Sequence, residues 1–282
     1  MRMHHRLAVR RSLAAVGAFV AGACGSPTAS PPIVINMPPT IESVVIGTRA
    51  EADQPIQVSA TVKDAETPLG QLTYIWSASP QTGIFNGSTT FSGSQAMIMW
   101  RPPKGQKTPD VYSVSLTVTE AYTSAGQAKQ NIVSSSATVH YNDSAAEVTS
   151  LGIDFLVQKF ANFNVSPAEA VSNFSDSCRG KADELGDVTV NRANFHILSG
   201  SFTPTPPTFD SNLTAGTVGG FCQFEDIPNS GPYAGRREFV SGTCVLTTVY
   251  ENFRWYLCDS TFSPPYQTTL ASLKGRVPGR IE

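Results

Sequence analysis

The segment Tyr112–Thr119, "YSVSLTVT", decides the fold of the first half of this 282-residue chain. Its apolar side chains alternate strictly with serine and threonine, which predicts a β-strand with one buried face and one face in water. Ile56–Lys63 and Leu72–Ser77 alternate in the same way, and clusters such as "DAETPLG" and "RPPKGQKTPD" separate the runs. About seven short strands in about 100 residues, with regularly spaced turns, predict an all-β sandwich.

The same region resembles a known family. The segments "ATVKDAETPLGQLTYIWSAS", "MIMWRPP" and "YSVSLTVTEAYTSAG" are similar to the PKD/cadherin-like group of bacterial immunoglobulin-like (Ig-like) domains, and the similarity covers most of residues 38–142. It implies an Ig-like domain over residues 40–142, with Trp76 as the core tryptophan of the third strand. No cysteine lies between positions 25 and 177, so we expect packing alone to hold this domain.

Three acidic residues of this domain resemble calcium-binding loop positions of cadherin-like domains: Asp64, Glu66 and Glu120. The full calcium pattern, several carboxylates at close spacing, is absent. We therefore expect polar turn residues here and no metal site.

The first 23 residues have the layout of a secretory signal peptide. Arginines without any acid come first, Leu13–Val20 is apolar, and small residues follow at Ala21–Ala23. The apolar run is too short to span a membrane. "AGAC" (Ala21–Cys24) resembles the bacterial lipobox, although Ala21 stands where that family usually has leucine. It also fits ordinary signal peptidase, which would cut the same bond and leave Cys24 without lipid.

Cysteine parity favours the lipid. The chain has five cysteines, and exported chains usually pair them. Lipid on Cys24 leaves an even set: Cys178, Cys222, Cys244 and Cys258. Two disulfides are expected, either Cys244–Cys258 across a hairpin with Cys178–Cys222, or a set that contains Cys222–Cys244. The spacing does not fit a zinc site.

Residues 24–39 form a proline-rich segment, which predicts an extended tether about 40 Å long. Without its signal the chain carries 16 basic and 22 acidic residues, a net charge of about −6. This mild acidity argues against a nucleic-acid partner. Gly25 is not the aspartate that retains lipoproteins at the inner membrane of enteric bacteria, so an outer-membrane location in the cell envelope is expected.

The second half follows a different pattern. Apolar residues from Val148 to Phe163 recur at steps of three and four, which predicts a helix. "SPAE" (Ser166–Glu169) predicts a second, capped helix that runs through Leu185. Strands are expected from Val188 onwards, and "CVLTTVYENFRWYLC" predicts a hairpin that turns near Glu251-Asn252. Helices followed by a curved antiparallel sheet indicate an α+β domain.

In its layout this half resembles the NTF2-like (SnoaL/ketosteroid isomerase-type) cone over residues 147–262, followed by a tail at 263–282. The resemblance implies a pocket inside the cone. Trp255 is expected in the core by its strand position, although it is also kept among the pocket candidates. The side chains on segments that could line the pocket are Asp187, Arg192, His196, Arg237 and Trp255.

No catalytic constellation emerges from the sequence. The two histidines outside the signal lie near no nucleophile motif, and no cofactor motif is present. Trp100, beside the "RPP" turn, is expected to be partly exposed and to contact a carbohydrate. The predicted function is a non-enzymatic, lipid-anchored binding or scaffold protein, whose partner is the membrane and an envelope protein or polysaccharide. The alternative is a small-molecule-binding or isomerase/hydrolase-type cone.

Overall fold

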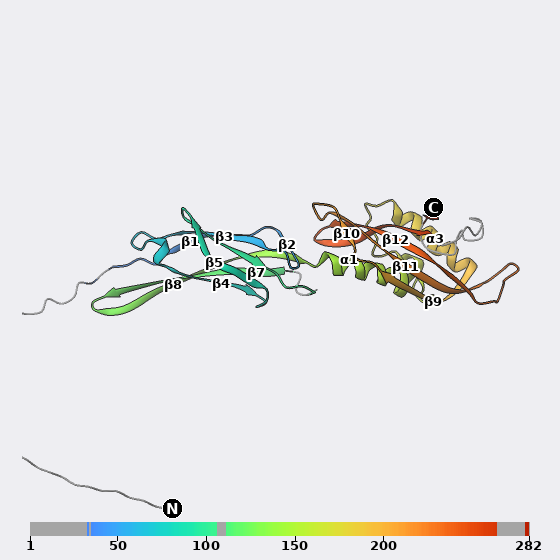
Figure 1. Ribbon diagram of the computed structural model, residues 1–282, viewed down its shortest axis with the longest axis horizontal. Coiled ribbons are helices and arrows are strands. Elements are labelled where there is room, and N and C mark those ends of the chain that lie inside the picture. Colours follow the sequence, from blue (N-terminus) through green and yellow to red (C-terminus); the bar gives the residue numbers. More distant parts are fainter. Residues whose placement is uncertain (1–32, 34, 106–110, 264–279, 282) are drawn as a thin grey trace, which may run out of the picture.

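The computed structural model describes residues 33, 35–105, 111–263 and 280–281, which form two domains arranged end to end (Figure 1). The predicted signal peptide 1–23, Cys24 and most of the predicted tether 24–39 lie outside the described residues. In Figure 1 the described chain enters at the left end, and the loop after β11 reaches the right end. The N-terminal entry and that loop therefore lie at opposite ends of an elongated molecule.

The first domain is a sandwich of two four-stranded sheets, ordered β1-β3-β6-β5 and β2-β8-β7-β4. This is the strand order of an Ig-like sandwich, in which the first strand is divided into two pieces, β1 in one sheet and β2 in the other. The domain is therefore Ig-like, as expected. Its strands are β1 (Thr40–Val45), β2 (Arg49–Glu51), β3 (Ile56–Lys63), β4 (Thr73–Ser79), β5 (Ile84–Ser92), β6 (Gln95–Arg101), β7 (Val111–Ser124) and β8 (Gln127–Asn142).

The core of the sandwich follows the alternation in the sequence. On β7, the residues from Tyr112 to Val118 at even positions are fully buried, while those at odd positions face outward. Trp76 lies in the core with an exposed fraction of 9%. The expectation for Trp100 was wrong, because it is fully buried against Tyr112, with ring centroids 5.5 Å apart. The alternation of β6 places Trp100 on the inner face.

The acidic residues of the sandwich serve local structure. The Asp64 carboxylate accepts hydrogen bonds from the backbone amides of Glu66 and Thr67, which is an Asx turn. Glu120 is fully buried and accepts hydrogen bonds from three side chains: Asn36, Thr67 and Asn131. In the described ranges, no three His, Cys, Asp or Glu side chains are grouped so that they could hold a metal ion.

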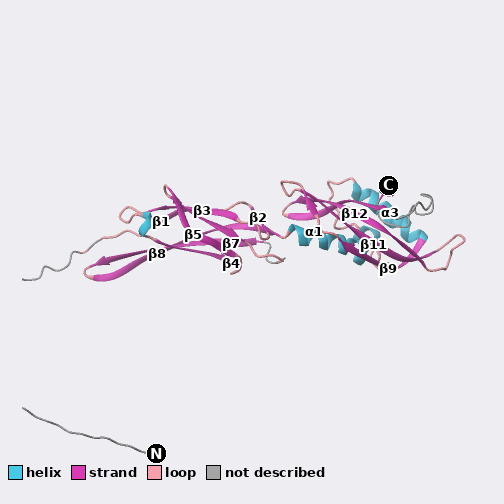
Figure 2. Cartoon of the chain, viewed as in Figure 1, coloured by secondary structure: helices cyan, strands magenta, loops and turns pink. Residues whose placement is uncertain are grey.

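The second domain places helices against one face of a curled sheet (Figure 2). Its helical elements are α1 (Ser144–Ile153), which continues as a π-helical segment (Asp154–Phe160), α2 (Pro167–Ala170) and α3 (Gly180–Asn194). The strands are β9 (Phe195–Pro204), β10 (Thr208–Phe209), β11 (Ala215–Pro228), β12 (Glu238–Glu251), β13 (Arg254–Ser263) and β14 (Arg280–Ile281). The sheet has the order β10-β11-β12-β13-β14, with β9 also paired to β11.

Two boundaries differ from the sequence expectation. Ser166 caps α2 by accepting a hydrogen bond from the Glu169 amide, but the helix ends at Ala170 instead of Leu185. The helix α3 then covers Val188–Asn194, which were expected to form a strand. The reason is that the buried residues Glu184, Val188 and Asn191 recur at the helical period. Part of the predicted tail is also ordered, since β14 pairs with β13.

The hairpin of β12 and β13 turns as expected. Asn252 and Phe253 form a two-residue turn, and both have positive φ (51° and 62°), as a type I′ turn requires. However, the first disulfide pairing was wrong. Cys244 pairs with Phe262 on β13. Cys258 lies in a bulge between Leu257 and Asp259, which pair with Thr248 and Thr247, so it is several residues away from Cys244 along the hairpin. The bonds are Cys222–Cys244 and Cys178–Cys258, the second set considered.

Candidate functional site

The pocket residues expected from the sequence do not meet in one cavity. Arg192 donates to the backbone carbonyls of Lys159 and Asn162, and Arg237 forms an exposed ion pair with Glu225. His196 is exposed, 5.0 Å from the Phe163 ring, whereas Asp187 is half-buried on α3. The last candidate, Trp255, is buried in the core.

The space between the helices and the sheet is filled by side chains of the domain itself. Phe155 packs edge-on against Phe174, with ring centroids 4.9 Å apart, and Phe160 packs against Phe224 at 5.3 Å. All four rings are almost completely buried. In the described residues, the space where the predicted pocket of the cone would lie is therefore occupied by the domain's own aromatic rings.

The two domains meet in a joint that is built around Arg49 of β2. Its guanidinium donates to the Leu213 carbonyl (2.7 Å) and to the Ser144 hydroxyl (2.8 Å), and it pairs with Glu51 (3.1 Å). The same guanidinium lies 3.7 Å from the centre of the Tyr250 ring. Such a mostly buried and paired guanidinium fixes the orientation of the two domains. A change of orientation would leave Arg49 and its partners without these contacts.

A second set of contacts continues the joint. Ser144 donates to Glu51 through its backbone amide and its hydroxyl (2.7 and 2.8 Å), and it accepts from the Trp255 indole (2.8 Å). The rings of His140 and Phe253 are stacked at 3.7 Å. The joint is therefore made of directional contacts, and no flexible linker separates the domains.

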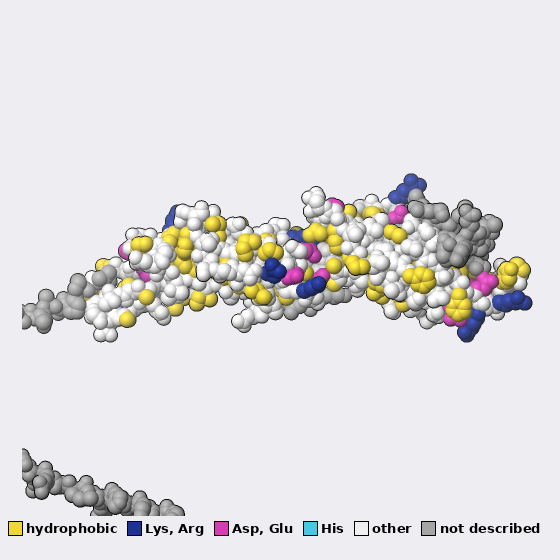
Figure 3. Space-filling model, in the orientation of Figure 1, with side chains coloured by type: hydrophobic (Ala, Val, Ile, Leu, Met, Phe, Trp, Pro, Cys, Tyr) yellow, Lys and Arg dark blue, Asp and Glu magenta, His cyan; other side chains and the backbone are white. Residues whose placement is uncertain are grey.

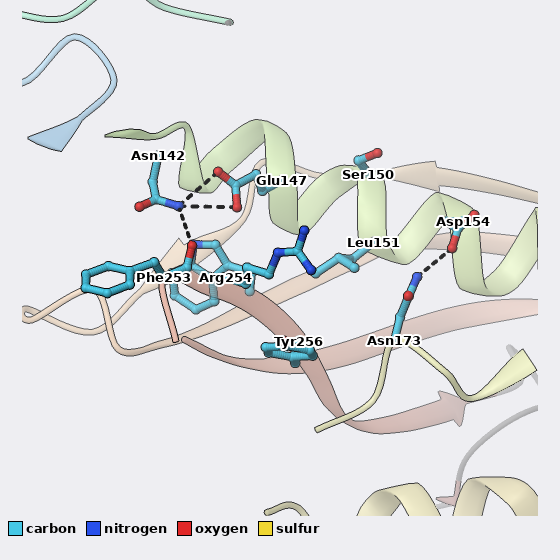
Figure 4. A pocket seen from close by; sticks show the side chains of 10 residues that line it. Asn142, Glu147, Ser150, Leu151, Asp154, Asn173, Phe253, Arg254 and Tyr256 are labelled. Carbon is cyan, nitrogen blue, oxygen red and sulfur yellow. Dashed lines mark hydrogen bonds between the residues drawn. The ribbon is translucent and has the colours of Figure 1, made fainter. Parts of the chain in front are cut away.

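An open cleft of about 400 Å³ begins beside this joint (Figure 4). One wall is α1 with its π-helical extension, the other is the start of β13, and Asn173 closes the far end. The lining consists of Asn142, Glu147, Ser150, Leu151, Asp154, Asn173, Phe253, Arg254, Trp255 and Tyr256. Sequence reasoning missed this cleft, because it assembles residues from three separate segments.

Polar groups of both signs face the cleft. Figure 4 shows the Arg254 side chain extending between β13 and α1, and no described residue forms an ion pair or hydrogen bond with it. Asp154 accepts from Asn173 (2.6 Å) and pairs with Lys159 (3.2 Å). Burial raises the pKa of Glu147, although hydrogen bonds from Asn142 and the Asp143 amide oppose this.

The position of Glu147 follows from helix capping. Asp143 caps α1 by accepting from the Ala146 amide, and Glu147 reaches back to the Asp143 amide. This reciprocal arrangement is a variant of the capping box. The local sequence "NDSAAE" (Asn142–Glu147) carries the signal for this helix start.

A second exposed surface lies at the end of the second domain that is farthest from the joint, in and after the β11–β12 loop. Figure 3 shows hydrophobic, basic and acidic side chains together at this right-hand end. Tyr233 and Phe239 have exposed fractions of 52% and 67%, and Arg236 and Arg237 are also exposed. We call these four residues the distal surface. Aromatic residues and arginine are the types that contribute most to protein–protein binding.

The comparisons with known proteins give no family. No family model matches the chain, and no curated protein matches it. Among solved structures, the N-terminal Ig1-2 module of the Drosophila receptor protein tyrosine phosphatase DLAR is similar. Its sequence identity is 8%, the alignment covers 80% of this chain and 97% of the other, and the TM-score is 0.26. Such a score establishes no shared fold, so the Ig-like assignment rests on the strand order of the two sheets.

Proposed function

We propose that this protein is a lipid-anchored, non-enzymatic binding protein of the bacterial cell envelope, in which the Ig-like domain is a spacer of the PKD/cadherin-like type. The second domain, of NTF2-like layout, is the part that binds a partner. The observation that carries this proposal is the Arg49 joint, because it links the two domains into one elongated body. A fixed joint suits a protein that holds a binding surface away from its anchor.

Further observations bear on this proposal. The chain enters the sandwich at one end of the molecule, and the distal surface lies at the other end (Figure 1). The interior of the second domain is filled by its own aromatic rings, which weighs against the isomerase or hydrolase alternative. Among the residues that the structure describes, no helix is long and apolar enough to cross a membrane. Under this proposal the lipid on Cys24 provides the attachment, on the outer membrane.

Replacing Cys24 tests the anchor. We expect the full chain, produced in a Gram-negative host, to partition with membranes and to incorporate labelled fatty acid. The variant Cys24→Ser should appear in the soluble periplasmic fraction without label, while the control Ser26→Ala should behave like the wild type. A wild-type chain that is soluble and unlabelled would contradict the proposed anchor.

Site-specific crosslinking tests the binding role. The distal surface presents two aromatic rings and two arginines, of which Arg237 pairs with Glu225. The rings and Arg236 suit a protein partner that offers apolar side chains and an acidic group. A photo-crosslinking amino acid at Phe239 should join the chain to one reproducible envelope protein in cells. The same amino acid at Ser134, on the outer face of the sandwich, is the matched control. Equal crosslinking at both positions, or none at Phe239, would contradict the proposal.

A further inference from the structure

The cleft between α1 and β13 has the chemistry of a binding site for a neutral ligand. Among its lining residues, Arg254 carries positive charge, while Glu147 and Asp154 carry the acidic groups. Lys159, which is not part of the lining, pairs with Asp154 (3.2 Å) and compensates its charge. A free anion would meet two carboxyl groups, and a free cation would meet the guanidinium of Arg254. The balance of charges therefore disfavours both kinds of ion.

The polar groups of the cleft are both donors and acceptors. Arg254 and the Asn173 amide donate, whereas Glu147 and Asp154 accept when ionised. A hydroxyl group is the common neutral group that donates one hydrogen bond and accepts others at the same time. A ligand with several neighbouring hydroxyls can satisfy both sets, since guanidinium and carboxylate groups are planar and bind two adjacent atoms.

The size and the apolar part of the cleft narrow the ligand further. Its volume of about 400 Å³ falls in the range of small-molecule sites and suits roughly one or two sugar rings. Leu151 and the ring of Tyr256 add apolar surface beside the polar groups. A pyranose ring has this mixed character, with hydroxyls at its rim and C–H groups on its faces.

From this combination we infer that the cleft binds a neutral saccharide, with Arg254 and Asp154 as hydrogen-bonding residues. The inference deepens the proposed binding role, on which it rests, by naming a ligand class. It does not depend on the lipid or on the distal surface. A lost saccharide site would leave membrane attachment and crosslinking at Phe239 unchanged, so the failures of the two ideas can be told apart.

The test is a titration of the oxidised chain from residue 24, carrying Cys24→Ser, with glucose, galactose, mannose, N-acetylglucosamine and their disaccharides. Saturation-transfer NMR reports binding directly, and Trp fluorescence is a second readout, because the residue Trp255 borders the cleft. We expect a Kd of about 1 mM or tighter for at least one neutral sugar. Glucuronate and glucosamine should bind at least about tenfold more weakly than the neutral sugar of the same ring.

Variants identify the site. Arg254→Ala should weaken binding by about tenfold or more, which is the size of a lost charge-assisted hydrogen bond. Its matched control is Arg236→Ala, an exposed arginine of the distal surface, and this variant should bind as the wild type does. Asp154→Asn, which keeps the shape of the side chain, should also weaken binding, and circular dichroism checks that this variant is folded. No binding of any neutral sugar, equal binding by Arg254→Ala, or tighter binding of a charged analogue would overturn the inference.

Discussion

The two domains close their cores in different ways. In the sandwich, two sheets cover each other, and the largest rings, Trp100 and Tyr112, are fully buried without any disulfide. In the second domain, one sheet is covered by helices on one face only, and Phe221 and Phe239 stay exposed on the other. Both disulfides belong to this second domain. In this protein, the disulfides therefore occur in the domain whose sheet is covered on one face only.

Glycines lie beside both disulfides. Cys222 lies opposite Gly242 and Cys244 opposite Gly220. A Cβ at Gly220 or at Gly242 would come within 2.7 Å of the ring of Phe202 or of Phe262, so these glycines leave room for the rings beside the disulfide. A Cβ at Gly180 would come within 2.1 Å of the Cys258 carbonyl oxygen. The start of α3 therefore lies directly on the backbone of β13, where Cys178–Cys258 holds it.

The two largest effects, of similar size, are expected in the two cores, and the first comes from removing the Cys178–Cys258 bond. The double variant Cys178→Ser/Cys258→Ser should destabilise the second domain by about 4 kcal/mol, because the bond closes a long loop in the unfolded chain. The sandwich should keep its stability. Urea unfolding followed by Trp fluorescence and by proteolysis of each domain checks this. Equal losses in both domains would break the comparison.

A core substitution in the sandwich is the counterpart. Trp100→Ala should cost about 3–5 kcal/mol in unfolding free energy, since it leaves a large cavity beside Tyr112. Reducing agent should have no additional effect on that domain. The control Met99→Ala, on the outer face of the same strand, should cost much less. A similar loss for both variants would show that Trp100 is not a core residue.

The joint predicts an intermediate effect. Arg49→Ala should weaken the coupling between the domains by about 1–3 kcal/mol, because it removes the side-chain donor to the Leu213 carbonyl and the cationic partner of Glu51. Calorimetry should then show two separate transitions. The control Arg101→Ala removes an exposed pair with Asp53 and should change stability by less than about 1 kcal/mol. Unchanged coupling in Arg49→Ala would contradict the rigid joint.

The smallest effect concerns pH. Burial raises the pKa of Glu120, but hydrogen bonds from Thr67, Asn131 and Asn36 outweigh it, so the pKa lies below its usual value. The stability from this carboxylate is present above the unfolded-state pKa of about 4.3 and is lost as pH falls through the folded value. Glu120→Gln should flatten this acid loss in thermal unfolding of the sandwich. An unchanged slope between about pH 5 and 3 would contradict it.

Much of the fold could be predicted from period-two alternation. It identified the sandwich strands and the turn at Asn252, and applied to Gln95–Arg101 it would also have buried Trp100. It failed at Val188–Asn194, where the β-branched residues favoured a strand although the buried residues Glu184, Val188 and Asn191 recur at the helical period. The hairpin turn could also have excluded the first disulfide pairing. When Glu251 pairs with Arg254, the register of the hairpin does not place Cys244 opposite Cys258.

The candidate site could not be predicted in the same way. Arg49 and Ser144 are 95 positions apart, and Ser144 and Trp255 are 111 apart, so no local pattern connects them. The cleft appears only when α1 packs beside the hairpin end. Nothing in the sequence around Arg254 marks it as a site residue, since an arginine after a turn is usually solvent-exposed.

The pairing of β2 with β8 has a mechanical consequence. The two strands are parallel, matched from Arg49 and His140 to Glu51 and Asn142, with flanking backbone bonds at Thr48 and Ala52. Tension between the N-terminal end and the far domain would pull β2 and β8 in opposite directions along their own axes. All bonds of the pair then share the load at once instead of opening one by one. The strand pair beside the joint thus acts as a shear clamp when the molecule is stretched.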